Sequence, residues 1–302
     1  MNTFTLKASA DDLNLAVAVA TPDTAPKGIF QIVHGMCEHK ERYYPFMEWL
    51  ASKGYAVICH DHRGHGASVK SPEDLGFFYE GGWKACVDDV KVVGDWARRE
   101  FGPLEFTLFG HSMGSMVVRC YTKRYDSTID RLIVCGCPSD NPAKGVGKAL
   151  ATLIGAVKGS HNRPRVMQML SFGTYNKPFR AEGYPAAWVC SDKDTLKAYH
   201  NDPLCQFVFT ANGFRNLLSL MQDCYSKKGW AMKKPSLPIH FLSGADDPCR
   251  ISDEAFAKAV EFIRARGYKT VDSKLYPGMR HEILNETDKK QVWNDILGLL
   301  NE

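Results

Sequence analysis

Short runs of apolar residues alternate with longer amphipathic segments along most of this chain. The runs are rich in β-branched and aromatic residues, as buried strands are, and they lie at 28–35, 55–61, 104–110, 131–136, 238–244 and 271–277. The amphipathic segments follow the helical period and lie at 43–53, 83–100, 112–125, 253–266 and 288–300. Two further segments predict an antiparallel hairpin at the edge of the sheet, at 3–7 and 13–20. The alternation predicts an α/β fold with a mostly parallel central sheet covered by helices on both faces.

The alternation stops at about Pro138 and resumes about a hundred residues later. The segment between is irregular, with helical patches, prolines and aromatic residues. An insertion of this length between two strands of one sheet predicts a cap over the edge of that sheet. We therefore expect a core formed by residues 1–138 and 236–302, and a mainly helical cap formed by residues 139–235.

The composition is that of an ordinary soluble globular protein, with 44% apolar residues, 24% charged residues and a net charge of +4. Because the chain has no basic tail, we expect no nucleic-acid partner. Two short lysine pairs, Lys227–Lys228 and Lys233–Lys234, allow at most a transient contact with an anionic lipid surface. A solvated loop is the simpler interpretation of these lysines.

No segment predicts export or membrane insertion. Residues 1–10 lack the charged start and apolar stretch of a secretion signal, and the apolar stretch 149–157 is too short to span a bilayer. We therefore expect a cytoplasmic protein. The ten cysteines agree with this expectation, because several lie inside apolar runs, where reduced cysteines act as small buried hydrophobes.

Two clusters invite a metal interpretation. Cys135 and Cys137 form a Cys-x-Cys pair, but no second pair follows at zinc spacing. The stretch HDHRGHG contains His60, His62 and His65, but it is followed by no carboxylate at ligand spacing and suits a hydrogen-bonded turn after a strand. We predict no metal site at either place.

The main candidate for chemistry is the motif Gly-His-Ser-Met-Gly at 110–114. It lies between a predicted strand and a predicted helix, which is the setting in which a Gly-x-Ser-x-Gly motif presents a nucleophile. The turn would project the Ser112 hydroxyl at the carboxyl edge of the sheet, where ligands bind in open α/β folds. The alternative is that Ser112 only caps a helix after a glycine turn.

A serine hydroxyl needs a base, and two later loops supply candidates. His281 follows the last predicted strand, and the adjacent Asp246 and Asp247 follow the strand before it. His281 would accept the proton of Ser112, and the aspartate would orient the imidazole and stabilise its charged form. Only one of the two aspartates can face the ring. Asp247 is the predicted acid, and Asp246 is the alternative.

The transition state also needs hydrogen-bond donors for its oxyanion. The first would be the backbone N–H of Met113, directly after the nucleophile. The second would come from the loop after an early strand, His34-Gly35-Met36, where the N–H of Met36 is the candidate. The neighbouring Glu38 and His39 would contact the substrate or pair with each other.

Together these pieces resemble the α/β-hydrolase superfamily and, within it, the monoacylglycerol lipase and bacterial lysophospholipase group of serine hydrolases. The matching stretches span nearly the whole chain and are HGMCEHKERY (34–43), DHRGHGAS (61–68), GHSMGS (110–115), NDPLCQFVFTANGF (201–214), SGADDPC (243–249) and YPGMRHEILNE (276–286). One departure is Cys249, where the group usually has an aliphatic residue.

The resemblance implies an α/β-hydrolase fold with an inserted cap and no metal or organic cofactor. It implies a triad of Ser112, Asp247 and His281, with Met36 and Met113 forming the oxyanion hole. Members of the group hydrolyse monoacyl lipid esters, lysophospholipids or smaller carboxylic esters.

The cap contains apolar and aromatic residues that would suit an acyl chain. We select Phe172, Trp188 and Phe207 as candidate substrate-binding residues, although each could equally belong to the core of the cap. We therefore predict a serine ester hydrolase that cleaves monoacyl lipid esters, a monoacylglycerol or a lysophospholipid, through an acyl-enzyme. The alternatives are a short-chain carboxylesterase, a peptide or amide hydrolase, and a non-catalytic protein with a hydrolase fold.

Overall fold

A single eight-stranded sheet runs through this computed structural model, which describes residues 1–301. The strand order is β1-β2-β4-β3-β5-β6-β7-β8, and every pair from β4 to β8 is parallel, whereas β1 and β2 are antiparallel. The strands are β1 (Asn2–Lys7), β2 (Asn14–Ala20), β3 (Gly28–Val33), β4 (Tyr55–His60), β5 (Phe106–His111), β6 (Arg131–Cys135), β7 (Ile239–Gly244) and β8 (Val271–Tyr276). The strands and the edge hairpin predicted from the apolar pattern are confirmed.

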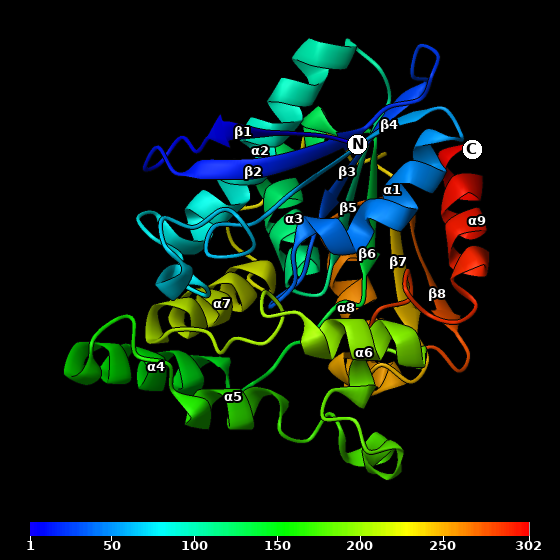
Figure 1. Cartoon of the computed structure of the whole chain (residues 1–302). Coiled ribbons are helices and arrows are strands. Elements are labelled where there is room, and N and C mark those ends of the chain that lie inside the picture. Colours follow the sequence, from blue (N-terminus) through cyan, green and yellow to red (C-terminus); the bar gives the residue numbers. More distant parts are fainter. Residues whose placement is uncertain (302) are drawn as a thin grey trace.

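Helices cover both faces of this sheet (Figure 1). One face carries α1 and α9, and the other carries α2, α3 and α8. These helices are α1 (Tyr44–Ala51), α2 (Gly82–Phe101), α3 (Met113–Tyr125), α8 (Asp253–Arg264) and α9 (Lys289–Leu300). Every residue of β3 is buried, because Ile29 and Val33 pack with one layer of helices and Phe30 and Ile32 with the other. This explains why the central strands read as continuous apolar runs instead of alternating ones.

Four helices lie between β6 and β7. They are α4 (Lys144–Lys158), α5 (Arg165–Phe172), α6 (Lys193–Asn201) and α7 (Ala211–Cys224). Side chains cap two of them, since Asp192 accepts from the N–H of Thr195 at α6 and Thr210 from that of Gly213 at α7. In Figure 1, α4, α5 and α6 gather beyond one end of the strands. We propose that residues 139–235 form a cap over that end.

The loops that matter for chemistry follow the carboxyl ends of parallel strands. The loop after β3 begins at His34, the turn after β5 contains Ser112, and the loops after β7 and β8 contain Asp247 and His281. Carboxyl ends of parallel strands meet at one edge of the sheet, so segments far apart in the chain converge there.

Two further observations concern the cysteines and the length of the apolar helices. All ten cysteines are buried and free, which confirms the prediction that they act as small hydrophobes. Within residues 1–301, no helix combines the length and the apolar character that crossing a bilayer requires.

Candidate active site

Ser112 lies in the turn between β5 and α3 with a strained backbone. Its φ is 54° and its ψ is −117°, in a region that residues with a side chain rarely adopt. Such a conformation costs about 1–3 kcal/mol and persists only where the surrounding structure holds it. The strand before and the helix after therefore fix Ser112, and its side chain lines the cavity described below.

The two glycines of the motif, Gly110 and Gly114, allow this turn because neighbouring backbone passes close to each of them. A Cβ at Gly114 would lie 2.0 Å from the carbonyl oxygen of Val33, at the end of β3. A Cβ at Gly110 would lie 2.5 Å from the carbonyl oxygen of Gly114. Real Cβ atoms do not approach backbone this closely, so any larger residue would push the turn away from β3.

Asp247 and His281 are brought together by the loops after β7 and β8. Nδ1 of His281 donates to Oδ2 of Asp247 at 2.9 Å, and the N–H of Cys249 donates to Oδ1 at 2.8 Å. Burial would raise the pKa of Asp247, but the charge and hydrogen bond of His281 and the N–H of Cys249 lower it. Asp246, the alternative acid, is exposed at the surface.

Ser112 and His281 both line one cavity. Because Nδ1 of His281 faces Asp247, Nε2 is the nitrogen left for a substrate or a hydroxyl, and it lies 4.0 Å from Sγ of Cys249. Among residues 1–301, no hydrogen bond joins the Ser112 hydroxyl to this imidazole. Catalytic hydrogen bonds are often long without substrate and tighten when it binds.

The loop after β3 passes directly against Ser112. A Cβ at Gly35 would lie 3.0 Å from Cβ of Ser112, so the next residue, Met36, enters the same cavity wall. Met113 is the first residue of α3, and the first N–H groups of a helix have no partner inside it. The N–H groups of Met36 and Met113 therefore belong to the two segments that border the serine.

The cavity has a volume of about 700 Å³, within the usual range for small-molecule sites. The three aromatic candidates from the proposed cap, Phe172, Trp188 and Phe207, all line it. The ring of Trp188 lies 5.1 Å from that of His281, centroid to centroid. Most of the remaining wall is apolar and includes Met116, Met169, Leu217, Leu218 and Met221.

Two buried histidines hold the loop after β3 in place. His34 donates from Nδ1 to the carbonyl of Gly35 at 2.8 Å and accepts the N–H of His62 at Nε2. His62 donates from Nε2 to the carbonyl of His34 and accepts the thiol of Cys86 at Nδ1. Burial lowers the pKa of both imidazoles, as it does for His60 and His65, to about 4 in the last two. The histidine-rich stretch is therefore a hydrogen-bonded turn, as predicted.

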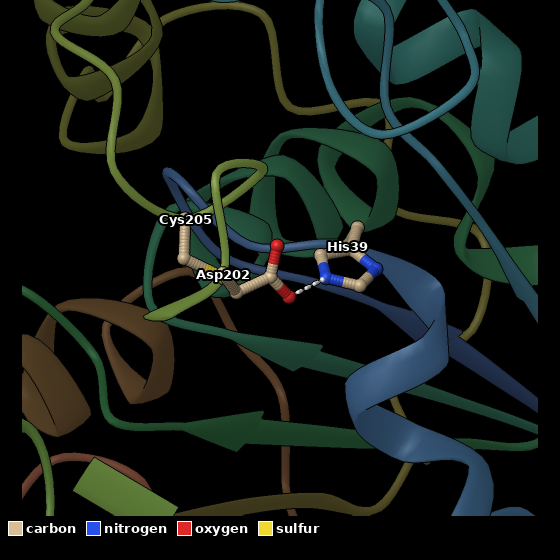
Figure 2. A group of neighbouring side chains, drawn as sticks. All are labelled: His39, Asp202 and Cys205. Carbon is tan, nitrogen blue, oxygen red and sulfur yellow. Dashed lines mark hydrogen bonds and ion pairs between the residues drawn. The ribbon is translucent and has the colours of Figure 1, made fainter. Parts of the chain in front are cut away.

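His39 joins this loop to the segment after α6 (Figure 2). Its Nε2 lies 2.7 Å from Oδ2 of Asp202, and its Nδ1 faces Glu41. With Cys205, these residues form a group whose ligand atoms lie within 4.8 Å of one another, close enough to hold a metal ion. Burial would lower the pKa of His39, but its hydrogen bonds to the two carboxylates raise it. The observed arrangement is thus an ion pair that ties the proposed cap to the core.

Comparisons with known proteins agree with this geometry. Residues 24–288 match the family model described as serine aminopeptidase, S33. The chain belongs to this family of α/β hydrolases. It is 26% identical over 289 residues to a monoacylglycerol lipase of Mycolicibacterium smegmatis, covering 96% of this chain and 93% of that protein. It is 27% identical over 285 residues to a monoglyceride lipase homolog of monkeypox virus, covering 91% and 90%.

Solved structures show the same fold. A carboxyl esterase from Bacillus coagulans has a TM-score of 0.89 at 24% identity, covering 99% of this chain and 97% of the other. A monoglyceride lipase from Saccharomyces cerevisiae has a TM-score of 0.72 at 17% identity, covering 100% and 95%. The prediction of an α/β-hydrolase fold is confirmed, and membership of the family makes this chain a serine hydrolase.

Of the two alternatives predicted for Glu38 and His39, pairing with each other is not observed. His39 faces Asp202 and Glu41, while Glu38 pairs with His111 at 2.9 Å and lines the cavity, so contact of Glu38 with a substrate stays a prediction. No signal in the sequence links Glu38 to His111, which lies 73 residues later, inside the serine motif. Sequence reasoning likewise missed the bidentate pair of Arg42 and Glu282 beside His281.

The close approach at Gly114 predicts a large stability loss on substitution. Gly114→Ala is expected to lower the free energy of unfolding by about 3 kcal/mol, because its methyl group would overlap the Val33 carbonyl. Gly298→Ala on α9 is the matched control, since nothing lies within 4 Å of its Cβ and alanine should stabilise this helix by up to about 1 kcal/mol. Urea denaturation measures both, and equal midpoints for the two variants would contradict the assigned packing.

Proposed function

We propose that this chain is a serine ester hydrolase that cleaves monoacyl lipid esters, monoacylglycerols in particular, through an acyl-enzyme. The observation that carries the proposal is the mostly apolar cavity of about 700 Å³ that contains both Ser112 and His281. Its aromatic and aliphatic wall suits an acyl chain, and its volume suits a single chain. The names of the relatives, monoacylglycerol lipase and monoglyceride lipase homolog, support the same substrate class.

In the proposed reaction, the Ser112 oxygen attacks the ester carbonyl while Nε2 of His281 accepts its proton. Asp247 keeps the ring in the tautomer that presents Nε2 and stabilises the imidazolium that forms. The imidazolium then protonates the leaving alcohol, and the acyl group remains on Ser112. A water molecule, activated by the same imidazole, releases the fatty acid. Proton transfer of this kind contributes about 10²–10⁴ in rate.

The oxyanion of each tetrahedral intermediate would accept the N–H groups of Met36 and Met113. Both segments border Ser112, as the close approach of Gly35 and the start of α3 indicate. Removing one donor of this type raises the activation barrier by about 3–4 kcal/mol. Since both donors are backbone groups, the methionine side chains are free to form part of the apolar wall.

The charges around the cavity favour a neutral leaving group. Apart from histidines, the charged side chains that line it among the described residues are Glu38, Arg165 and Glu282. The two carboxylates lie beside the catalytic loops, whereas Arg165 is exposed on α5. Both carboxylates are already paired, Glu38 with His111 and Arg42 and Glu282 with Arg42, so a phosphate of a lysophospholipid would lose its water there without an unpaired cation to replace it. The hydroxyl groups of glycerol carry no such penalty.

A peptide substrate is less well supported, although the family description includes aminopeptidases. Gripping a free amino terminus requires an unpaired carboxylate near Ser112. Within the described chain, Glu38 pairs with His111 and Glu282 with Arg42, so both carboxylates that line the cavity are already engaged. A short-chain carboxylesterase shares every catalytic feature and differs only in the acyl length it accepts.

The outer surface of α4 and α5 supports contact with a lipid surface. Six large apolar side chains are exposed there: Val146, Leu153, Val157, Val166, Met169 and Leu170. Residues 141–181 contain seven lysines and arginines and no acidic residue. Because Met169 also lines the cavity, this face lies next to its entrance. We infer that α4 and α5 rest on an anionic lipid surface, in preference to the lysine pairs at 227–228 and 233–234.

Removing the nucleophile tests the chemistry. Ser112→Ala should lower kcat by about 10⁵-fold or more, because the acyl-enzyme cannot form. A fluorophosphonate should add one adduct to the native protein, at Ser112 by mass spectrometry, and none to the variant. Hydrolysis of p-nitrophenyl esters of graded length should rise toward long acyl chains. A maximum at acetate or butyrate would favour the short-chain carboxylesterase, and no turnover at any length would refute the proposal.

The head-group argument predicts a preference among substrates with one acyl chain. A monoacylglycerol should be hydrolysed with a kcat/KM at least about tenfold above that of the lysophosphatidic acid with the same acyl group, which corresponds to about 1.4 kcal/mol. Free fatty acid release, measured below the concentration at which either lipid forms micelles, gives both values. Equal rates would mean that the carboxylates beside the site do not select the leaving group.

The lipid-surface contact predicts a specific loss of binding. Leu153→Asp should weaken sedimentation with phosphatidylglycerol vesicles by about tenfold, since burying a leucine contributes about 1.5–3 kcal/mol. Met232→Asp is the matched control, because Met232 is another exposed apolar residue outside α4 and α5. Turnover of a soluble short-chain ester should be unchanged in Leu153→Asp. If both variants bind vesicles equally well, the contact lies elsewhere.

A further inference from the structure

A buried carboxylate–imidazole pair connects the loop after β3 to the loop that carries His281. Nδ1 of His111 lies 2.9 Å from Oε1 of Glu38, and Nε2 of His111 lies 3.1 Å from the carbonyl oxygen of His281. Both side chains are almost completely buried. His111 is the residue before Ser112, so the pair touches three of the segments that form the site.

The hydrogen-bond partners determine the charge of this pair. Oε1 of Glu38 also accepts the N–H of Gly35 and, at 3.0 Å, the hydroxyl of Tyr43, while Oε2 accepts from Arg42 at 3.3 Å. An oxygen that already accepts this many donors has no room for its own proton, so Glu38 is ionised and Nδ1 of His111 donates to it.

The other ring nitrogen of His111 carries a proton for the same reason. It faces the carbonyl oxygen of His281, and a carbonyl oxygen can only accept. With both nitrogens donating, the ring is an imidazolium. The electrostatics agree: burial alone would raise the pKa of Glu38, but the charge of His111 lowers it to about 2. Burial would likewise lower the pKa of His111, but the Glu38 carboxylate raises it above its ordinary value.

We propose that His111 is a positioning residue that is an imidazolium at neutral pH and holds the His281 loop through its carbonyl and the oxyanion loop through Glu38. The catalytic part of this inference rests on the proposed ester hydrolysis. Oε1 of Glu38 accepts the N–H of Gly35, the residue directly before the proposed donor Met36. The same oxygen accepts from Nδ1 of His111, whose other nitrogen contacts the loop of the proposed base, His281. The two halves of the machinery, oxyanion donor and base, are thereby fixed relative to each other.

The charge of His111 also lies close to the reacting groups. Its ring centroid is 4.6 Å from that of His281. Because the Glu38 carboxylate is paired with His111, this charge can lie beside His281 with little opposition to the imidazolium that forms there in the proposed reaction. Gly136, with a φ of 55°, permits the contact, because a Cβ there would lie 3.1 Å from Nε2 of His111 and 3.2 Å from the His281 carbonyl.

The pH dependence of this device has a definite sign. Because the pKa of folded His111 is raised, the stability that the pair contributes is complete below the ordinary pKa of histidine and is lost as the pH rises through the raised value. Neutral His111 keeps one donor only, so it releases either Glu38 or the carbonyl of His281. The other ionisable side chains around the pair are Arg42, Tyr43, His65, Asp247, His281 and Glu282, with the buried thiols Cys37, Cys59, Cys135 and Cys205.

The direct test is NMR of the native protein labelled with ¹⁵N-histidine. The His111 signals are those missing from His111→Gln. We expect both ring nitrogens of His111 to be protonated at pH 7 and to remain so above the ordinary pKa of histidine. Chemical shifts of a neutral tautomer at pH 7 would overturn the inference. This measurement needs no substrate, so it stands even if every ester assay fails and the proposed function is abandoned.

Kinetics then test the positioning role. Glu38→Gln should move the alkaline limb of kcat to lower pH by about one unit, because an amide no longer stabilises the imidazolium. His111→Gln should lower kcat by about 10- to 100-fold, with KM changed less than about twofold, because a misplaced base slows chemistry more than binding. A merely structural role would lower activity at every pH without moving the limb.

The matched control is Asp202→Asn, which makes the same carboxylate-to-amide change at another histidine–carboxylate pair that joins two loops near the site, His39 with Asp202. It should leave the alkaline limb where it is in the native enzyme. If Asp202→Asn moves the limb and Glu38→Gln does not, His39 is the titrating group and the assignment to His111 is wrong. If Glu38→Gln does not fold, the NMR titration of the native protein still decides the protonation state.

Discussion

The contact between the turn at Ser112 and the end of β3 is the constraint on which the site depends. The serine has a backbone conformation that it would not adopt alone, and it is held because Gly114 lies against the carbonyl of Val33. The same contact sets the distance between Ser112 and the loop that begins at His34. One steric condition therefore fixes two segments of the proposed site, and this explains why glycines flank the serine on both sides.

Ionisable groups beneath the site are arranged in pairs that cross from loop to loop. Glu38 with His111, His39 with Asp202, Arg42 with Glu282, and Asp247 with His281 each join segments distant in the sequence. An unpaired charge buried at this depth would be costly, so removing one partner of a pair is strongly destabilising. The loops at the edge of the sheet are thus held by charge, in contrast to the strands, which are held by apolar packing.

The sequence predicts the apolar packing of the strands better than it predicts the charged pairs between the loops. Strands such as β3 and helices such as α3 follow from local patterns of apolar residues, and the loop positions of Ser112, Asp247 and His281 follow from strand ends. The partner of Glu38 could not be predicted, because it depends on how two loops meet in space. The choice between Asp246 and Asp247 also required coordinates, since adjacent residues share every local signal and differ only in which way they face.

The burial of all ten cysteines has a consequence for the unfolded chain. In the folded protein only Cys37, Cys205 and Cys249 line the cavity, and burial raises the pKa of most of the ten thiols, so air oxidation is slow. Once the chain opens, ten thiols become exposed together and can couple at random through disulfide bonds. Refolding then competes with cross-linking, so the recovery of this enzyme after heating depends on the reducing power of its surroundings as much as on the packing of its core.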